Sequence, residues 1–191
     1  MIDTPRTRLR GWTAADRDAF AAMTADPEVM RDLGGPMSRA ASDTKLNGYR
    51  AAFDRYGFCR WVIESRDGRF LGYAGVMPSH DGHPLGAHFQ VGWRLARDAW
   101  GKGYASEAAQ AALNDIFART GLNEILSYTA PDNKRSQAVM ERLKLEREPS
   151  LDFTEATGNV GVWHGLVWVA RRALWFGDRG EQCARSGSKW P

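Results

Sequence analysis

The chain has 191 residues, of which 43% are hydrophobic and 26% are charged, a composition that fits one globular domain and excludes a disordered chain. No apolar run approaches the roughly 18 residues of a membrane-spanning helix, and Met1 to Arg6 lack the apolar core of a secretory leader. The net charge of +3 is too small to indicate nucleic-acid binding. We therefore expect a cytoplasmic protein with no membrane or nucleic-acid partner, whose cysteines Cys59 and Cys183 are free thiols.

The first part of the chain predicts one strand followed by three helices. Alternation of polar and apolar residues indicates an edge strand, and N-capping residues and Gly-Pro punctuation mark the helix ends. In chain order these are a strand at 6–12, a helix capped by Thr13 that buries Phe20 and Met23, a short helix opened by Asp26-Pro27 and ended by Gly34-Gly35-Pro36, and a helix at 38–55.

Between residues 58 and 95 the pattern changes to strands. The segments 58–64 and 70–76 are rich in β-favouring residues and flank Asp67-Gly68, a dipeptide typical of hairpin turns. A loop at 78–86, rich in Gly, Pro and His, precedes a third alternating segment at 88–95. These features predict three neighbouring strands of one sheet.

The second half predicts helices and strands in alternation and a polar end. An Ala-rich helix runs from Tyr104 to a cap at Gly121, a strand covers 125–130, a helix is capped by Asn133, and a last strand covers 160–169. The order predicts a mixed α/β (α+β) fold with a mostly antiparallel sheet flanked by helices. We expect a single domain at 1–176 and a flexible tail at 177–191.

The strongest local motif is a strand, a Gly-x-Gly turn and a helix between Leu95 and Ala108. Such a turn exposes unpaired backbone amides at the positive end of the helix dipole, which favours a pyrophosphate. A P-loop is excluded because Ala96 stands where its first glycine belongs. A dinucleotide fingerprint is excluded because Ser106 takes the place of its third glycine.

Several ordered motifs together resemble the GNAT superfamily of N-acetyltransferases, and within it the branch that includes the ribosomal-protein N-terminal acetyltransferases. Trp100 to Ala105 aligns with the family's coenzyme A motif Gln/Arg-x-x-Gly-x-Gly/Ala, departing from it at Trp100. Residues 91–95 resemble the family's splayed fourth strand, and Asn133 to Ser136 resembles the branch's Asn-x-x-Ser. Residues 8–12 and 26–30 are also typical of the branch.

The resemblance implies the GNAT fold and transfer of an acetyl group from acetyl-coenzyme A to an amine, either a protein N-terminus or a small amine, in a ternary complex. A homodimer is possible because dimers are common in the family, and no metal is expected. The residues implied to bind the coenzyme are Trp93, Arg94, Leu95, Trp100, Gly101, Lys102, Gly103, Tyr104, Ala105, Asn133, Lys134, Arg135 and Ser136.

The sequence departs from the family at the positions that move protons. Met140 stands where many relatives carry a catalytic Tyr, which leaves Ser136 as the candidate proton donor or as a coenzyme-binding hydroxyl. Gln90 stands where relatives often carry Glu, and a glutamine cannot act as a base. His80 and His83 in the preceding loop are candidate bases, because histidine titrates near physiological pH. A metal role for these histidines and an ordinary solvated loop are the alternatives.

Two other functions stay open at the level of sequence. The missing Glu and Tyr are compatible with a non-catalytic module that senses or binds acyl-coenzyme A. A nucleotide-binding protein is the third alternative, and ATP binding would be its signature.

Overall fold

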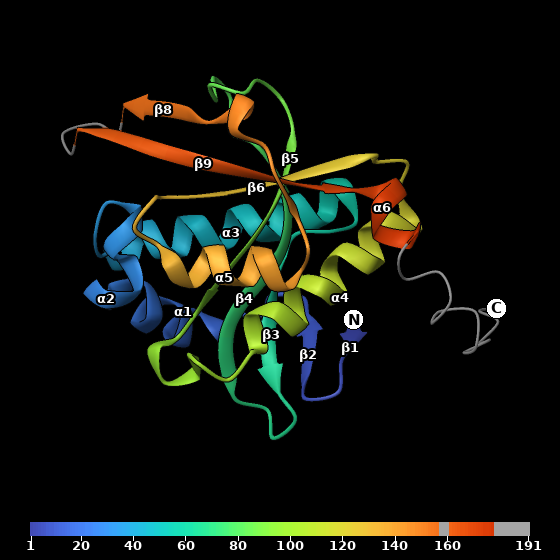
Figure 1. Cartoon of the computed structure of the whole chain (residues 1–191). Helices are drawn as coiled ribbons and strands as arrows, with labels where there is room; N and C mark the ends of the chain where they lie inside the picture. Colours follow the sequence, from blue (N-terminus) through green and yellow to red (C-terminus); the bar gives the residue numbers. More distant parts are fainter. Residues whose placement is uncertain (157–160, 178–191) are drawn as a thin grey trace, which may run out of the picture.

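The computed structural model describes residues 1–156 and 161–177 (Figure 1). Its centre is a nine-stranded sheet in the order β1-β2-β3-β4-β5-β6-β9-β7, with β8 paired to β9. The strands are β1 (Ile2–Asp3), β2 (Thr7–Arg10), β3 (Arg60–Ser65), β4 (Phe70–Pro78), β5 (Phe89–Leu95), β6 (Glu124–Thr129), β7 (Glu146–Arg147), β8 (Phe153–Ala156) and β9 (Val162–Arg171).

The sheet divides at one point, between β5 and β6. All other neighbouring strands are antiparallel, whereas β5 and β6 are parallel and pair only through Gln90 and Leu126. Beyond that pair the Ser127 hydroxyl still donates to the Val91 carbonyl at 3.1 Å. Residues 92–95 pair with β4 on one side and with no strand on the other. Their backbone groups on the β6 side therefore face an opening.

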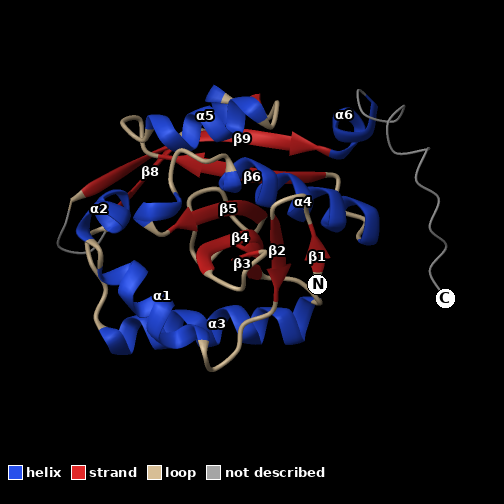
Figure 2. Ribbon diagram, turned by 90° about the horizontal axis from the view of Figure 1, so that it is seen from below, coloured by secondary structure: helices blue, strands red, loops and turns tan. Residues whose placement is uncertain are grey.

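Helices cover both faces of the sheet (Figure 2). One layer contains α1 and α3, and the other contains α4 and α5, with α2 beside the open end of β5. The helices are α1 (Asp16–Ala25), α2 (Pro27–Met30), α3 (Arg39–Tyr56), α4 (Tyr104–Arg119), α5 (Lys134–Arg142) and α6 (Arg172–Gly177), with short 3-10 turns η1 (Arg31–Leu33), η2 (Arg97–Ala99) and η3 (Pro149–Leu151). No helix in the described residues is long and apolar enough to cross a membrane.

The predicted fold class and element order are confirmed, with corrections at several ends. Thr13 does not cap α1. The helix begins at Asp16, whose carboxylate instead accepts from the Thr13 amide and hydroxyl and pairs with Arg10. α4 is capped by Thr120, not Gly121, and the hydroxyl of Thr120 bonds the Ile116 carbonyl at 2.8 Å.

Some expectations fall partly outside the described chain. Gly177 ends α6, and the rest of the expected tail, 178–191, lies outside the described residues, as does Cys183. The start of the strand expected at 160–169 does so too, and β9 is described from Val162. Cys59 is a buried free thiol, as predicted.

Candidate active site

A cavity of about 860 Å³ opens between β5, the Gly-Lys-Gly turn, α5 and the α2–η1 segment. It lies beside the part of β5 that has no strand partner on the β6 side. Every residue that the sequence implied for coenzyme binding lines this cavity: Trp93, Arg94, Leu95, Trp100, Gly101, Lys102, Gly103, Tyr104, Ala105, Asn133, Lys134, Arg135 and Ser136. The end of β5, the glycine turn that follows it and the more distant Asn133–Ser136 motif thus meet at one place.

The turn before α4 presents backbone amides to the cavity. Gly101 and Gly103 have φ of +75° and +79°, a left-handed conformation that L side chains rarely adopt. Within the described chain, no backbone carbonyl accepts from the amides of Gly101, Lys102 and Gly103. The first amides of α4 follow directly, at the positive end of the helix dipole. This geometry suits a diphosphate group.

Trp100, the departure from the family motif, joins the turn to both walls of the cavity. Its indole Nε1 donates to the Leu95 carbonyl at the end of β5 at 2.9 Å. The Arg135 guanidinium of α5 stacks 4.0 Å from the centre of its ring. The cation–π contact places the charge of Arg135 beside the amides of the turn. Trp100 therefore supports the phosphate turn without contributing the side chain that the motif usually has.

The N-terminal segment braces the same turn from outside. Arg6 donates to the Lys102 carbonyl at 2.7 Å and to Glu107 Oε2 at 2.6 Å. Glu107, in the first turn of α4, also accepts from the Arg6 amide and from the Thr4 hydroxyl. Tying down the Lys102 carbonyl fixes the orientation of the peptide groups whose amides face the cavity.

Asp32 connects the walls at the other end of the cavity. Its carboxylate lies 3.2 Å from Arg94 Nη1 and accepts from Asn133 Nδ2 at 2.6 Å. Arg94 also donates to the Val29 carbonyl. Burial lowers the pKa of Arg94, but the neighbouring Tyr73 and Asp32 outweigh that effect and raise it. The guanidinium therefore stays charged beside the open edge of β5.

Ser136 lies on the cavity wall in the first turn of α5. Its amide donates to the Asn133 side chain at 3.0 Å, which caps the helix as predicted and turns the hydroxyl-bearing residue toward the cavity lining. Met140, one turn later, is 1% exposed and packs in the core. Ser136 is thus the hydroxyl that the Asn-x-x-Ser motif brings to this wall.

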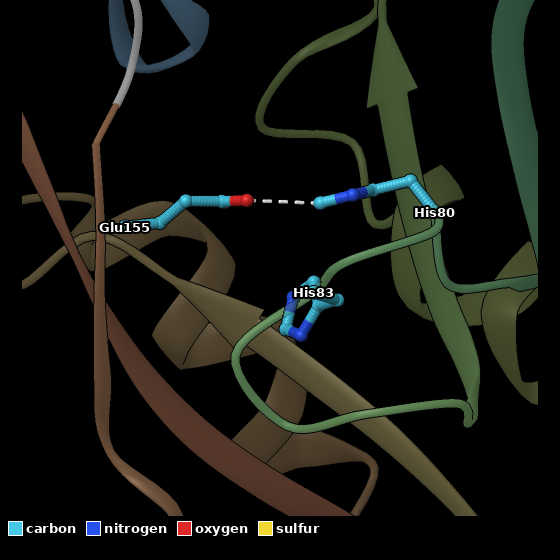
Figure 3. A group of neighbouring side chains, drawn as sticks. All are labelled: His80, His83 and Glu155. Carbon is cyan, nitrogen blue, oxygen red and sulfur yellow. Dashed lines mark ion pairs between the residues drawn. The ribbon is translucent and has the colours of Figure 1, made fainter.

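His80 and His83 do not line the cavity. They lie in the loop between β4 and β5, facing β8 (Figure 3). His80 Nε2 is 3.0 Å from Glu155 Oε1, and the His83 ring packs between Tyr128 and Phe153. This histidine group joins the loop to the β8–β9 hairpin.

The chemistry of His83 suits packing better than metal binding. The ligand atoms of His80, His83 and Glu155 lie within 4.8 Å of one another. However, His83 Nδ1 accepts from the Leu85 amide at 3.1 Å, which places the hydrogen of the neutral ring on Nε2, a buried atom with no hydrogen-bond partner among the described residues. Binding a cation through Nε2 would require the ring to give up this hydrogen bond or its hydrogen. Burial and the nearby His88 lower the pKa of His83, which keeps the ring neutral.

Comparison with known proteins agrees with this geometry. Residues 6–146 match the family model of the acetyltransferase (GNAT) domain. The chain is 32% identical over 144 residues to the uncharacterized protein YkkB of Bacillus subtilis (strain 168), covering 73% of this chain and 81% of that protein. A GNAT-family acetyltransferase structure from Bacillus anthracis aligns with TM-score 0.73 at 23% identity, covering 90% of this chain and 98% of that one. A spermidine N-acetyltransferase from Vibrio cholerae, solved with CoA and spermine, aligns with TM-score 0.68 at 18% identity, covering 89% and 98%.

The family match, together with the split sheet and the glycine turn at its opening, gives the class of protein as an acetyltransferase. The family model covers most of the chain, and the chain therefore belongs to the acetyltransferase (GNAT) family. The structures below 25% identity support the fold alone.

Several residues at this site were not found from the sequence. Glu28, Val29, Arg31, Asp32 and Arg142 also line the cavity, and Arg6 and Glu107 brace its turn. Glu28 and Val29 fall within residues 26–30, which resemble the family branch. The others belong to no motif, since their position depends on how distant segments pack. The one available signal was Asp26-Pro27, which predicted the short helix that carries Glu28 and Val29.

Proposed function

We propose that this protein transfers an acetyl group from acetyl-coenzyme A to a primary amine, of a protein N-terminus or of a small molecule, by direct attack in a ternary complex. The observation that carries the proposal is the convergence of the β5 opening, the glycine turn and the Asn133–Ser136 cap on one cavity. The similarity of the first strand and of the α2 segment to the ribosomal-protein N-terminal branch supports a place in that branch.

The proposed chemistry assigns the donor to the cavity. The amides of Gly101 to Ala105 and the charges of Lys102, Lys134 and Arg135 would bind the coenzyme phosphates. The backbone amides of β5 that lack a partner at 93–95 would stabilise the oxyanion of the tetrahedral intermediate. Ser136, on the facing wall, would relay to the leaving thiolate the proton that the attacking amine loses, so that its own hydroxyl is restored. His80 and His83 lie outside the cavity, so we give them no part in this step.

A non-catalytic acyl-coenzyme A-binding module is the second candidate. It is favoured by the absence of a titratable acid or phenol at Gln90 and Met140, where relatives carry Glu and Tyr. Gln90 is instead held by Arg60, whose Nη2 donates to Gln90 Oε1 at 3.0 Å. Both candidates require the donor site, and they differ in turnover.

The first test is thermal unfolding with acetyl-coenzyme A, coenzyme A and ATP added separately. A ligand at about 100 times its dissociation constant stabilises the fold by about 2.7 kcal/mol, a shift of several degrees in the midpoint. We expect shifts with both coenzymes and none with ATP, followed by thiol release with amines. No shift with acetyl-coenzyme A would contradict both candidates, and binding without turnover of any amine would leave the binding module.

A further inference from the structure

Among the described residues, Lys45 of α3 and Arg60 of β3 have no acidic partner. Arg6, Arg10 and Arg94 each pair with a carboxylate. Within residues 1–156 and 161–177, no Asp or Glu oxygen forms such a pair with Lys45 or Arg60. Both side chains are half-buried, so they are only partly solvated yet open to a ligand. A half-buried charge without a counter-charge is costly.

Arg60 lies against the strand that borders the donor cavity. Its guanidinium occupies the space that a side chain at Gly92 would fill, since a Cβ added there would lie 1.8 Å from Nη1. Alternate residues of a strand share a face, so Arg60 lies on the face of β5 that carries the Gln90 and Arg94 side chains. The distance from Gly92 to Arg94 along the strand is about 7 Å. The Arg60 guanidinium therefore lies against Gly92, two residues along β5 from Arg94, which lines the cavity.

Lys45 lies on α3 one helical turn before Tyr49, whose ring centre is 5.4 Å from the ring centre of Tyr73. Burial raises the pKa of Tyr73, but the charges of Lys45, Arg94 and Arg60 outweigh it and lower that pKa. Tyr73 lies opposite Arg94 in the β4–β5 register. Lys45, Arg94 and Arg60 are thus the cations that act on this phenol, and among them Arg94 has Asp32 as its counter-charge.

We propose that Arg60 and Lys45 bind an oxyanion of the acceptor, so that the substrate is an amine that also carries a carboxylate or a phosphate. A guanidinium binds either group with two parallel charge-assisted hydrogen bonds. With the oxyanion at Arg60, the amine of the same molecule can approach β5 at 93–95. This inference rests on the proposed function, because it specifies the acceptor of that reaction.

The test compares amines that differ only in the oxyanion. The pairs are lysine and pentane-1,5-diamine, phenylalanine and 2-phenylethylamine, and O-phosphoethanolamine and ethanolamine. Catalytic efficiency is measured by thiol release, and binding is measured by thermal unfolding of the coenzyme A complex. We expect the wild-type protein to prefer an oxyanion-bearing member by about 10- to 100-fold. The pair that shows the preference separates carboxylate from phosphate.

Arg60→Gln and Lys45→Gln should reduce that preference to within about threefold of unity while acetyl-coenzyme A still binds. Arg50→Gln, on the exposed face of α3, makes the same charge change and should retain the wild-type preference. Equal efficiency and equal stabilisation across every pair, or a preference that persists in Arg60→Gln, would overturn the inference. Acetylation without preference would leave the proposed function standing, whereas failure to bind acetyl-coenzyme A would contradict the proposed function itself.

Discussion

At the scale of single residues, Tyr49 and Tyr73 form a pair of buried phenols with unequal acidity. Their ring centres are 5.4 Å apart between α3 and β4, and both side chains are buried. Burial and the neighbouring Tyr73 raise the pKa of Tyr49. Burial raises the pKa of Tyr73 as well, but Lys45, Arg94 and Arg60, together with a hydrogen bond from Tyr49, outweigh burial and lower it to about 8. The positive charges therefore select which phenol ionises first.

We predict that one tyrosine of the folded protein ionises near pH 8. Tyrosinate absorbance at 295 nm should rise between about pH 7 and 9 in the wild type and not in Tyr73→Phe. Arg60→Gln should move the rise to higher pH, because one of the three cations that stabilise the phenolate is removed, whereas Arg50→Gln should not. A wild-type spectrum that is unchanged up to pH 9.5 would contradict the lowered pKa.

The same group links stability to pH. An unfolded tyrosine ionises near pH 10, so the folded state releases this proton at lower pH than the unfolded state. Ionisation of Tyr73 therefore adds to the free energy of unfolding as pH rises from about 8 to 10, and this contribution is lost as pH falls through 8.

At the scale of elements, the N-terminal segment and α4 form a clamp on the phosphate turn. Burial raises the pKa of Glu107, but hydrogen bonds from Thr4 and Arg6 outweigh it and lower the pKa, so the carboxylate stays ionised. Arg6 is held by that carboxylate while it donates to the Lys102 carbonyl. The clamp contacts the cavity lining at the turn and at Tyr104, whose ring centre is 5.0 Å from the Arg6 guanidinium carbon. It therefore acts on the coenzyme through the conformation of the turn and the first residue of α4.

We predict that Glu107→Gln weakens acetyl-coenzyme A binding, because Arg6 loses the carboxylate that holds it. The loss of affinity should be about fivefold, or about 1 kcal/mol, since Arg6 is half-exposed and its ion pair is partly screened. Calorimetric titration of the coenzyme measures this change. Glu141→Gln on the exposed side of α5 is the matched control and should bind as the wild type does. An unchanged affinity in Glu107→Gln would show that the turn holds its shape without the clamp.

The elements that the sequence predicted are those whose signal is local. α2 and α5 begin where Asp26 and Asn133 cap them, and the β3–β4 hairpin follows from Asp67-Gly68. β1, β7 and β8 were missed because they have two to four residues and are stabilised by pairing with β2 or β9, which no local pattern encodes. The predicted start of α1 was wrong because Asp16 pairs with a residue of another element, Arg10 of β2.

The same distinction applies to the candidate site. Trp93 to Leu95, Trp100 to Ala105 and Asn133 to Ser136 are contiguous motifs, and their backbone geometry could be predicted from sequence. Asp32, Arg6 and Arg60 reach the site from segments whose positions depend on tertiary packing. Site residues whose side chains contact other elements could therefore be identified only from the structure.

At the scale of the whole molecule, both helical layers share one hydrophobic core. Trp12, Phe20 and Tyr49 on the α1–α3 side belong to the same cluster of buried residues as Leu113 and Phe117 on the α4 side. The layers are joined through the apolar residues of β3, β4 and β5 between them. The donor cavity opens at the edge of this core, so its shape depends on the integrity of the whole sheet.

A shared core predicts that the described residues unfold as one unit. Phe117 is fully buried in α4, and its ring centre lies 6.0 Å from that of Trp175. Phe117→Ala should therefore lower the free energy of unfolding by about 3–5 kcal/mol. Phe53→Ala, at a residue that is 44% exposed, should cost less than about 1 kcal/mol. Denaturant unfolding followed by tryptophan fluorescence and by far-UV circular dichroism measures both. Tryptophans lie on both sides of the sheet, so their fluorescence reports on both helical layers. We expect one transition that coincides in both signals and whose midpoint moves to lower denaturant in Phe117→Ala. Two separate transitions would show that the helical layers are independent units.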